Sequence, residues 1–303
     1  MSPVTPKTGM DVLREKKLAR KGGLGREHAA NKIALAILWL AAGITVAALA
    51  VILIYVIVRG IGVISPSFIF TWPHGVNSEG GIWPTIVSTL YCTLLSMLFT
   101  TPIAILAAVY LAEYAKQGRV VRIIRFAADS LASVPSIVMG LFGLTFFVEA
   151  MHIPMSMLSA AMALTLLMLP IVMRTTEEAI RAVPRYIRWG SYGLGATKWQ
   201  TVSRVVLPTA MPRIITGLVL ALGRAIGETA VVFYTMGLAI NLPLLPTESG
   251  RSMAVHLYLM AVEGINLPAA YGTAFLLMVI ILALNMGARW IAKRYHRRME
   301  TKK

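Results

Sequence analysis

The sequence predicts an all-α polytopic membrane protein with six transmembrane helices. Of the 303 residues, 57% are hydrophobic and only 14% are charged, whereas a soluble chain carries about a quarter charged residues. The apolar residues also gather into long runs, and a helix of about 20 apolar residues spans the core of a bilayer. Composition and run length therefore indicate the same class of protein.

The first predicted span, 33–58, contains no charged residue. It is longer than a bilayer requires, so we expect it to tilt or to extend past the hydrocarbon core. A polar leader of 32 residues precedes it, and the apolar run continues past Ala48-Leu49-Ala50, which resembles a cleavage site. These features favour an uncleaved anchor over a signal peptide.

Five further apolar runs complete the expected topology. They are 83–112, 134–148, 158–173, 214–240 and 271–291. The third of the six spans is the shortest, and we retain it because its removal would turn every later loop inside out. The segments 59–82 and 241–270 are expected as ordered outer loops, with a short helix at 253–260 on or in the membrane.

The net charge of +16 is explained mainly by topology. Of the 29 lysines and arginines, 26 lie in 1–32, 113–133, 174–213 and 289–303. This asymmetry places those segments, and hence both termini, in the cytoplasm. We expect the basic tails, 1–32 and 293–303, to contact anionic lipid rather than nucleic acid. The single cysteine and the scattered histidines suggest no metal site.

The longest inner loop, 174–213, is predicted to hold two helical pieces joined by a glycine turn. Thr176 is expected to cap a short helix that begins with Glu177 and Glu178, because acids suit a helix N-terminus. Pro184 then breaks or restarts that helix. A capping box from Thr197 to Gln200 starts the next one, which is expected to end near Leu207-Pro208. Such a unit is either a simple connection or a docking element for a soluble partner.

Arg224 and Glu228 lie midway in the predicted span 214–240, which is otherwise uncharged. They are four residues apart, so a continuous helix places them on one face, beside Gly223 and Gly227, where a neighbouring helix can approach. Arginine in mid-membrane is costly. The pair is either an ion pair that locks helix packing or a site where Arg224 donates to a tetrahedral oxyanion in a translocation path while Glu228 tunes it.

The inner loop resembles the EAA loop of binding-protein-dependent ABC importer permeases. A glycine and a Leu-Pro pair stand at the family's spacing in the runs Leu194-Gly195-Ala196-Thr197-Lys198-Trp199-Gln200-Thr201 and Val205-Val206-Leu207-Pro208. The resemblance implies that the loop couples to an ATPase. The family's signature glutamate falls on Trp189, so Glu177 or Glu178 substitutes for it, or the contact is apolar through Trp189.

Two further runs resemble the A-type permease subunit of phosphate importers. They are Arg174-Thr175-Thr176-Glu177-Glu178-Ala179 and Arg224-Ala225-Ile226-Gly227-Glu228-Thr229-Ala230. The resemblance implies a MetI-like core, 83–292, of five helices after one extra helix. It also implies a bacterial inner-membrane location and Arg174 as a second arginine of the path, although topology alone also explains an arginine there.

The same resemblance implies a set of partners. They are a second, C-type permease subunit, a dimer of ATP-binding subunits, an extracytoplasmic phosphate-binding protein and inorganic phosphate itself. No glycine is followed by lysine, so the sequence lacks a P-loop. We therefore expect a non-catalytic chain without a cofactor, which couples to ATP hydrolysis on its partners.

Three alternatives to a phosphate importer remain at this stage. An importer of another oxyanion is the nearest. A proton-coupled secondary transporter would share the intramembrane charges, but it needs no cytosolic docking helices, and the sequence has no detectable inverted repeat. An intramembrane enzyme would pair Glu228 with His152 or His256, yet both histidines fall in or near outer loops.

Overall fold

The computed structural model describes residues 9–74 and 79–300, with side chains for residues 31–73, 80–290 and 294. Most side chains of the predicted basic tails, 1–32 and 293–303, lie outside this description. The chain divides into two compact units, residues 1–56 and 57–303.

The first unit contains most of helix α1 (Gly9–Ile61). Within it, Asn31–Ile61 is long and apolar enough to cross a membrane, which confirms the first predicted span. Its side chains are almost all exposed, as expected for a helix whose apolar surface faces lipid.

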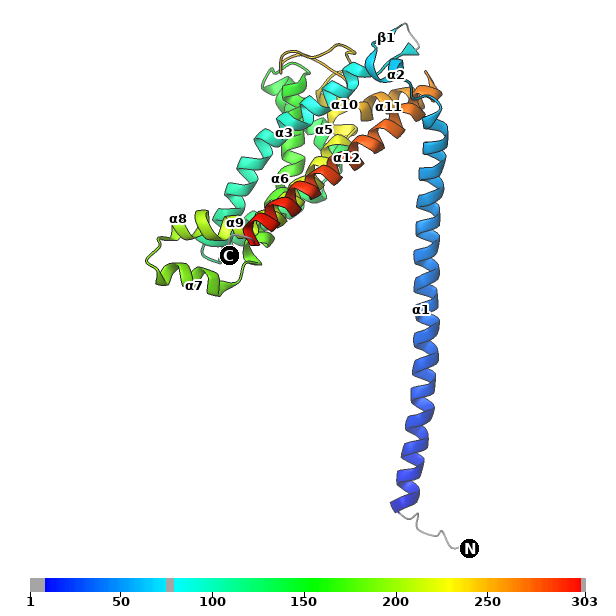
Figure 1. Ribbon diagram of the computed structural model, residues 1–303, viewed down its shortest axis with the longest axis vertical. Coiled ribbons are helices and arrows are strands. Elements are labelled where there is room, and N and C mark those ends of the chain that lie inside the picture. The colour runs from blue at the N-terminus through cyan, green and yellow to red at the C-terminus, as the bar shows by residue number, and fades with distance from the viewer. Residues whose placement is uncertain (1–8, 75–78, 301–303) are drawn as a thin grey trace. The chain divides into compact units, whose positions relative to one another are not determined.

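The second unit is a helical bundle (Figure 1). Its long helices are α3 (Trp83–Val109) with its π-helical end η1 (Tyr110–Tyr114), α6 (Met157–Arg181), α9 (Leu207–Ile226) and α12 (Leu267–Glu300). The shorter elements are α2 (Pro66–Phe70), β1 (Pro73–His74), β2 (Glu79–Gly80), α4 (Arg119–Ser133), α5 (Ser136–Gly143), η2 (Leu144–Ala150), α7 (Arg185–Gly193), α8 (Lys198–Thr201), η3 (Val202–Val206), α10 (Ala230–Thr235) and α11 (Met253–Val262).

The two ends of the bundle are built differently. Figure 1 shows α7 and α8 at one end, and α2, the β1–β2 hairpin and α11 at the other. We call the end that carries α7 and α8 the α7–α8 end. Helix α11 confirms the short helix predicted at 253–260.

The third predicted span, 134–148, forms α5 and η2. This segment is bent sharply relative to the preceding helix α4. The described residues contain five helices long and apolar enough to span, and a sixth only if α4 and the α5–η2 segment are counted together, with a bend of 100° between them. The bend lies at Val134-Pro135. A residue before proline is disfavoured in the helical conformation, so the chain turns there.

The fifth predicted span, 214–240, is wrong at both ends. The helix that contains this span is continuous from Lys198, so it starts earlier than predicted. Pro208 was expected to end the preceding helix, but the π-helical η3 comes just before it and accommodates it within one continuous helix. At the other end, α9 stops at Ile226 with Gly227 as its C-cap, and α10 starts only at Ala230.

The fourth span extends further than the predicted 158–173, and Thr176 does not cap a helix. Thr176 is buried inside α6, whose true N-cap is Ser156 in a capping box with Ser159. Ion pairs at i, i+4 continue α6 past Met173. The break predicted at Pro184 is confirmed, since α7 begins at the next residue.

Helices α3 and α6 are the helix pair in most extensive contact, and the buried face of α3 consists mostly of small residues. These small residues include Thr85, Ser88, Thr89, Thr93, Ser96, Thr100, Ala104 and Ala108. One hydroxyl joins the two helices, as Thr165 Oγ1 donates to the carbonyl oxygen of Ser96 at 3.2 Å. Small side chains let helix backbones approach closely, which is how membrane helices gain packing energy without a hydrophobic driving force.

Candidate functional site

Helices α7 and α8 and the turn between them form a helical hairpin at the α7–α8 end of the bundle. The glycine turn and the helix start at Thr197 are as predicted, but the first helix of the hairpin is α7, whereas the helix predicted from Thr176 to Ala182 is the end of α6. Thr197 and Gln200 form the predicted capping box, with Thr197 N donating to Gln200 Oε1 at 2.9 Å. Gly195 has φ of +81°, a left-handed conformation that glycine adopts without strain, and it closes the turn after α7.

The hairpin presents large apolar and aromatic side chains outward. Leu194 at the turn is 91% exposed and Trp189 is 66% exposed. The other exposed members are Tyr186, Tyr192 and Trp199. Exposed apolar residues grouped in this way mark an interaction surface. Of the sequence-predicted coupling residues, Gly195, Ala196, Thr197 and Lys198 lie on this turn or at its edge, whereas Leu207 and Pro208 lie at the start of α9.

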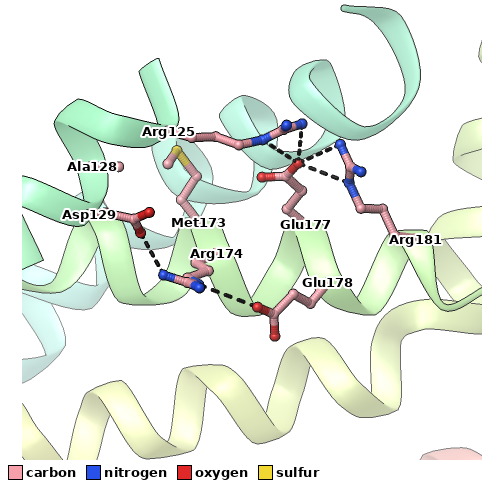
Figure 2. A pocket seen from close by; sticks show the side chains of 8 residues that line it. All are labelled: Arg125, Ala128, Asp129, Met173, Arg174, Glu177, Glu178 and Arg181. Atoms are coloured by element: carbon pink, nitrogen blue, oxygen red, sulfur yellow. Dashed lines mark hydrogen bonds and ion pairs between the residues drawn. The ribbon is translucent and has the colours of Figure 1, made fainter. Parts of the chain in front are cut away.

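Glu177 and Glu178, the other predicted coupling residues, lie on α6 rather than on the hairpin. Figure 2 shows both beside three arginines. Arg125 approaches Glu177 Oε1 with Nε at 3.1 Å and Nη2 at 2.7 Å, and Arg181 approaches the same oxygen with Nε at 2.9 Å. Glu177 is 7% exposed. Its carboxylate is therefore buried and paired, and it is not presented to a docking partner.

Arg174 lies in the same group of charges but in a more open position. Its Nη1 contacts Asp129 Oδ1 at 2.6 Å, and its Nε contacts Glu178 Oε1 at 3.3 Å. The side chains of all three are more than half exposed. Together with Arg125, Glu177 and Arg181 they line a cavity of about 270 Å³ between α4 and α6. We call these six residues the α4–α6 charge cluster.

Arg224 and Glu228 are not paired across a helix face. Arg224 lies in the last turn of α9, where a cation interacts favourably with the helix dipole. Glu228 follows the C-cap Gly227, and the two side chains form no ion pair. The prediction of a mid-helix pair is therefore wrong, because Gly227 ends the helix between them. Gly223 does face a neighbouring helix, as a Cβ there would lie 3.6 Å from the side chain of Asn285 on α12.

The histidines of the enzyme alternative do not form a site with Glu228. Burial, with a contribution from Arg251, lowers the pKa of His256 to about 4, so the imidazole is neutral at physiological pH. Neither of its ring nitrogens has a hydrogen-bond partner within the described chain. His152 is an exposed residue of the connection between η2 and α6.

Sequence reasoning missed five charged residues that the structure brings into contact. Asp129 and Arg125 on α4 and Arg181 on α6 belong to the charge cluster, and Glu113 on η1 pairs with Arg188 on α7. The signal for the first two was their i, i+4 spacing in segment 113–133, whose arginines were counted only for topology. Glu113 and Arg188 are 75 residues apart, so no local pattern links them.

These features define a polytopic helical membrane protein with an exposed helical hairpin at one end. Residues 100–301 match the family of binding-protein-dependent transport system inner membrane components. The chain belongs to this family. It is thus an inner-membrane component of a binding-protein-dependent transport system.

Relatives in bacteria cover most of the chain. The probable ABC transporter permease protein YqgI of Bacillus subtilis is 34% identical over 89% of this chain and 97% of its own length. The phosphate transport system permease protein PstA 1 of Mycobacterium tuberculosis is 35% identical over 75% of this chain and 77% of its own length.

Solved structures share the fold. A chain of a bacterial ABC transporter that imports the acidic polysaccharide alginate is 17% identical, with a TM-score of 0.59 over 84% of this chain and 96% of that one. A chain of the MetNI methionine ABC transporter, in an inward facing conformation, is 18% identical, with a TM-score of 0.56 over 71% and 94%. The predicted ABC importer permease fold is confirmed.

Proposed function

We propose that this chain is the A-type permease subunit of an ATP-driven importer of inorganic phosphate. The observation that carries the proposal is the similarity to phosphate transport system permease proteins, which are about one third identical over some three quarters of the chain. The comparisons do not favour a secondary transporter, since the matched family is a component of binding-protein-dependent systems.

The proposed partners follow from that assignment. A second, C-type permease completes the membrane path, two ATP-binding subunits hydrolyse ATP, and an extracytoplasmic binding protein delivers phosphate. In this arrangement the α7–α8 hairpin and both termini lie in the cytoplasm, as the basic residues of the inner segments favour. This chain needs no cofactor and no catalytic residue of its own.

The hairpin is the proposed contact with the ATP-binding subunits. Trp189 occupies the position of the family's signature glutamate and is exposed, whereas Glu177 is buried in its ion pairs. Glu178 is exposed but lies on α6 in its pair with Arg174, not on the hairpin. Of the alternatives that the sequence left open, the geometry therefore supports an apolar contact through Trp189, to which the exposed Leu194 and Trp199 of the same hairpin add. The α7–α8 hairpin would act as a lever that moves the bundle when the ATPases close.

Arg174 and Arg224 are the proposed phosphate-binding residues of the path. A guanidinium offers a planar fork of donors that suits phosphate oxygens. Arg174 is held by Asp129 and Glu178 in an exposed pair, and such pairs contribute little to stability. A passing phosphate can therefore replace a carboxylate at small cost. Glu228 is proposed to tune the path near Arg224, from the segment after α9.

Uptake by the reconstituted complex tests this proposal. Vesicles that hold the two permeases and the ATP-binding subunits, with the binding protein outside and ATP within, should accumulate labelled phosphate only when ATP is present. The variant Arg224→Gln should assemble normally and lose uptake. Normal phosphate uptake by the Arg224→Gln complex would remove Arg224 from the path, and ATP-independent uptake would contradict the importer itself.

A further inference from the structure

The guanidinium of Arg188 is held by groups from two other elements. Arg188 Nη2 contacts Glu113 Oε1 at 2.6 Å, and Arg188 Nε donates to the same oxygen at 3.0 Å. Both side chains are largely buried, at 15% and 8% exposure. Arg188 belongs to α7 and Glu113 to η1, the inner continuation of α3.

The same guanidinium also caps α6. Arg188 Nη1 donates to the carbonyl oxygen of Val183 at 2.6 Å, and Nη2 donates to that of Ile180 at 2.9 Å. Ile180 lies in the last turn of α6 and Val183 just after its C-cap Ala182, and a cation at the C-terminus of a helix complements the helix dipole. One side chain of the hairpin therefore bonds both the end of α3 and the end of α6.

Apolar packing surrounds these polar contacts. One buried cluster contains Val109 of α3, Ile180 of α6, Val206 of η3 and Val183 from the link between α6 and α7, and Ile187 of α7 packs against it. A buried ion pair that loses one partner leaves an uncompensated charge behind. The Arg188–Glu113 pair is therefore costly to open, and the α7 end of the hairpin is fastened to α3 and α6, the helix pair in most extensive contact.

We propose that Arg188, with Glu113, is the joint that transmits motion of the α7–α8 hairpin to α3 and α6. This inference rests on the proposed function and names the residues that couple the lever to the path. Arg188 is a positioning residue: it touches neither phosphate nor nucleotide. Lysine cannot replace it, because an ammonium is a point charge that cannot hold the carboxylate and two carbonyls in the same fork geometry.

Coupling between ATP hydrolysis and transport is the first test. In the reconstituted complex, Arg188→Lys and Glu113→Gln should each lower phosphate transported per ATP hydrolysed by about tenfold, the scale of mutations along a coupling network. ATP hydrolysis by the assembled complex should persist but lose its stimulation by the loaded binding protein. The matched control is Arg122→Gln, an exposed arginine of α4, which should leave the ratio unchanged.

Two results would overturn the proposal. One is an unchanged ratio of phosphate to ATP in assembled Arg188→Lys and Glu113→Gln complexes. The other is a loss of uptake that merely follows a loss of assembly in both variants, which would make the pair a structural element only. Glu113→Gln keeps the shape of the side chain and an acceptor oxygen, so it separates loss of charge from loss of packing.

A distance measurement makes the test independent of the substrate. Spin labels at Gly193→Cys, an exposed position at the end of α7 with nothing within 4 Å of an added Cβ, and at the exposed Leu106→Cys report the spacing of the hairpin tip and α3, while the native Cys92 is buried. On ATP addition the tip and α3 should move together in the otherwise unaltered complex, with a constant distance. In the Arg188→Lys complex the distance distribution should shift or broaden on ATP addition. An equally constant distance would contradict the proposed joint. This outcome does not depend on which anion the complex transports.

Discussion

The Arg188–Glu113 pair and the Arg174–Asp129 pair are alike in chemistry and opposite in setting. Both join an arginine to a carboxylate at 2.6 Å. The first is buried and carries two further carbonyl contacts, whereas the second is more than half exposed at both partners. The comparison teaches that burial, not distance, separates a fixed connection from one that a substrate anion can displace.

The largest effect is expected at the buried member of this comparison. Glu113→Ala leaves the Arg188 guanidinium buried without its carboxylate and should lower the free energy of unfolding by about 3 to 5 kcal/mol. Chemical unfolding of the purified protein in detergent measures it. The control Glu149→Ala, at an exposed residue of η2, should change nothing measurable. Equal stability of the two variants would remove the contrast between buried and exposed pairs.

Adjacent glutamates of α6 sharpen the same contrast within one helix. Glu177 is buried against Arg125 and Arg181, but both arginines are partly exposed, so solvent screens the pair. Glu177→Ala should cost about 2 kcal/mol, while Glu178→Ala, one residue on and exposed, should have no detectable effect. Thermal unfolding of the two variants side by side measures the difference, and a larger loss for Glu178→Ala would reverse our assignment.

The turn of the hairpin should respond to backbone conformation alone. Nothing lies within 4 Å of a Cβ at Gly195 or at Gly190. Gly195 has φ of +81°, so Gly195→Ala should destabilise the protein by about 1 kcal/mol. Gly190 lies inside α7, where alanine is the better helix former, so Gly190→Ala should stabilise it by about 0.5 to 1 kcal/mol. Opposite signs in thermal unfolding are the expected result.

The exposed pair should show the smallest effect on stability and a clear effect on transport. Asp129→Asn and Arg174→Gln should each unfold like the unaltered protein, because water and ions already screen both side chains. Uptake of labelled phosphate should fall in Arg174→Gln, since the proposed anion-binding group is gone. A stability loss comparable to that of Glu113→Ala would show that the pair is a fixed connection after all.

Apolar run length predicted the long spans well and their ends poorly. Residues 83–112 and 271–291 form parts of long helices, because a run of about 20 apolar residues has no other stable conformation in lipid. The ends depend on backbone detail. Pro208 was expected to end a helix, yet η3 lets the helix continue, and Gly227 ends α9 inside an apolar run.

The candidate site was only partly accessible from sequence. The α7–turn–α8 hairpin follows from local signals, namely Pro184, Gly195 and the Thr197 capping box. The Arg224–Glu228 pair rested on the assumption that the helix continues, which it does not. Asp129 lies 45 residues from its partner Arg174, and Glu113 lies 75 residues from its partner Arg188, so no periodicity connects either pair.

The sequence by itself determined that this chain is a polytopic helical membrane protein, and its motifs pointed to the permease family and to the hairpin that distinguishes the inner loop. These properties follow from composition, run length and short-range turn chemistry. Only the tertiary structure decided which charges are buried, which carboxylate each arginine meets and where the third span bends. The physical reason is that burial and ion pairing depend on how α3, α4, α6 and α7 pack, and packing joins residues that no local pattern relates.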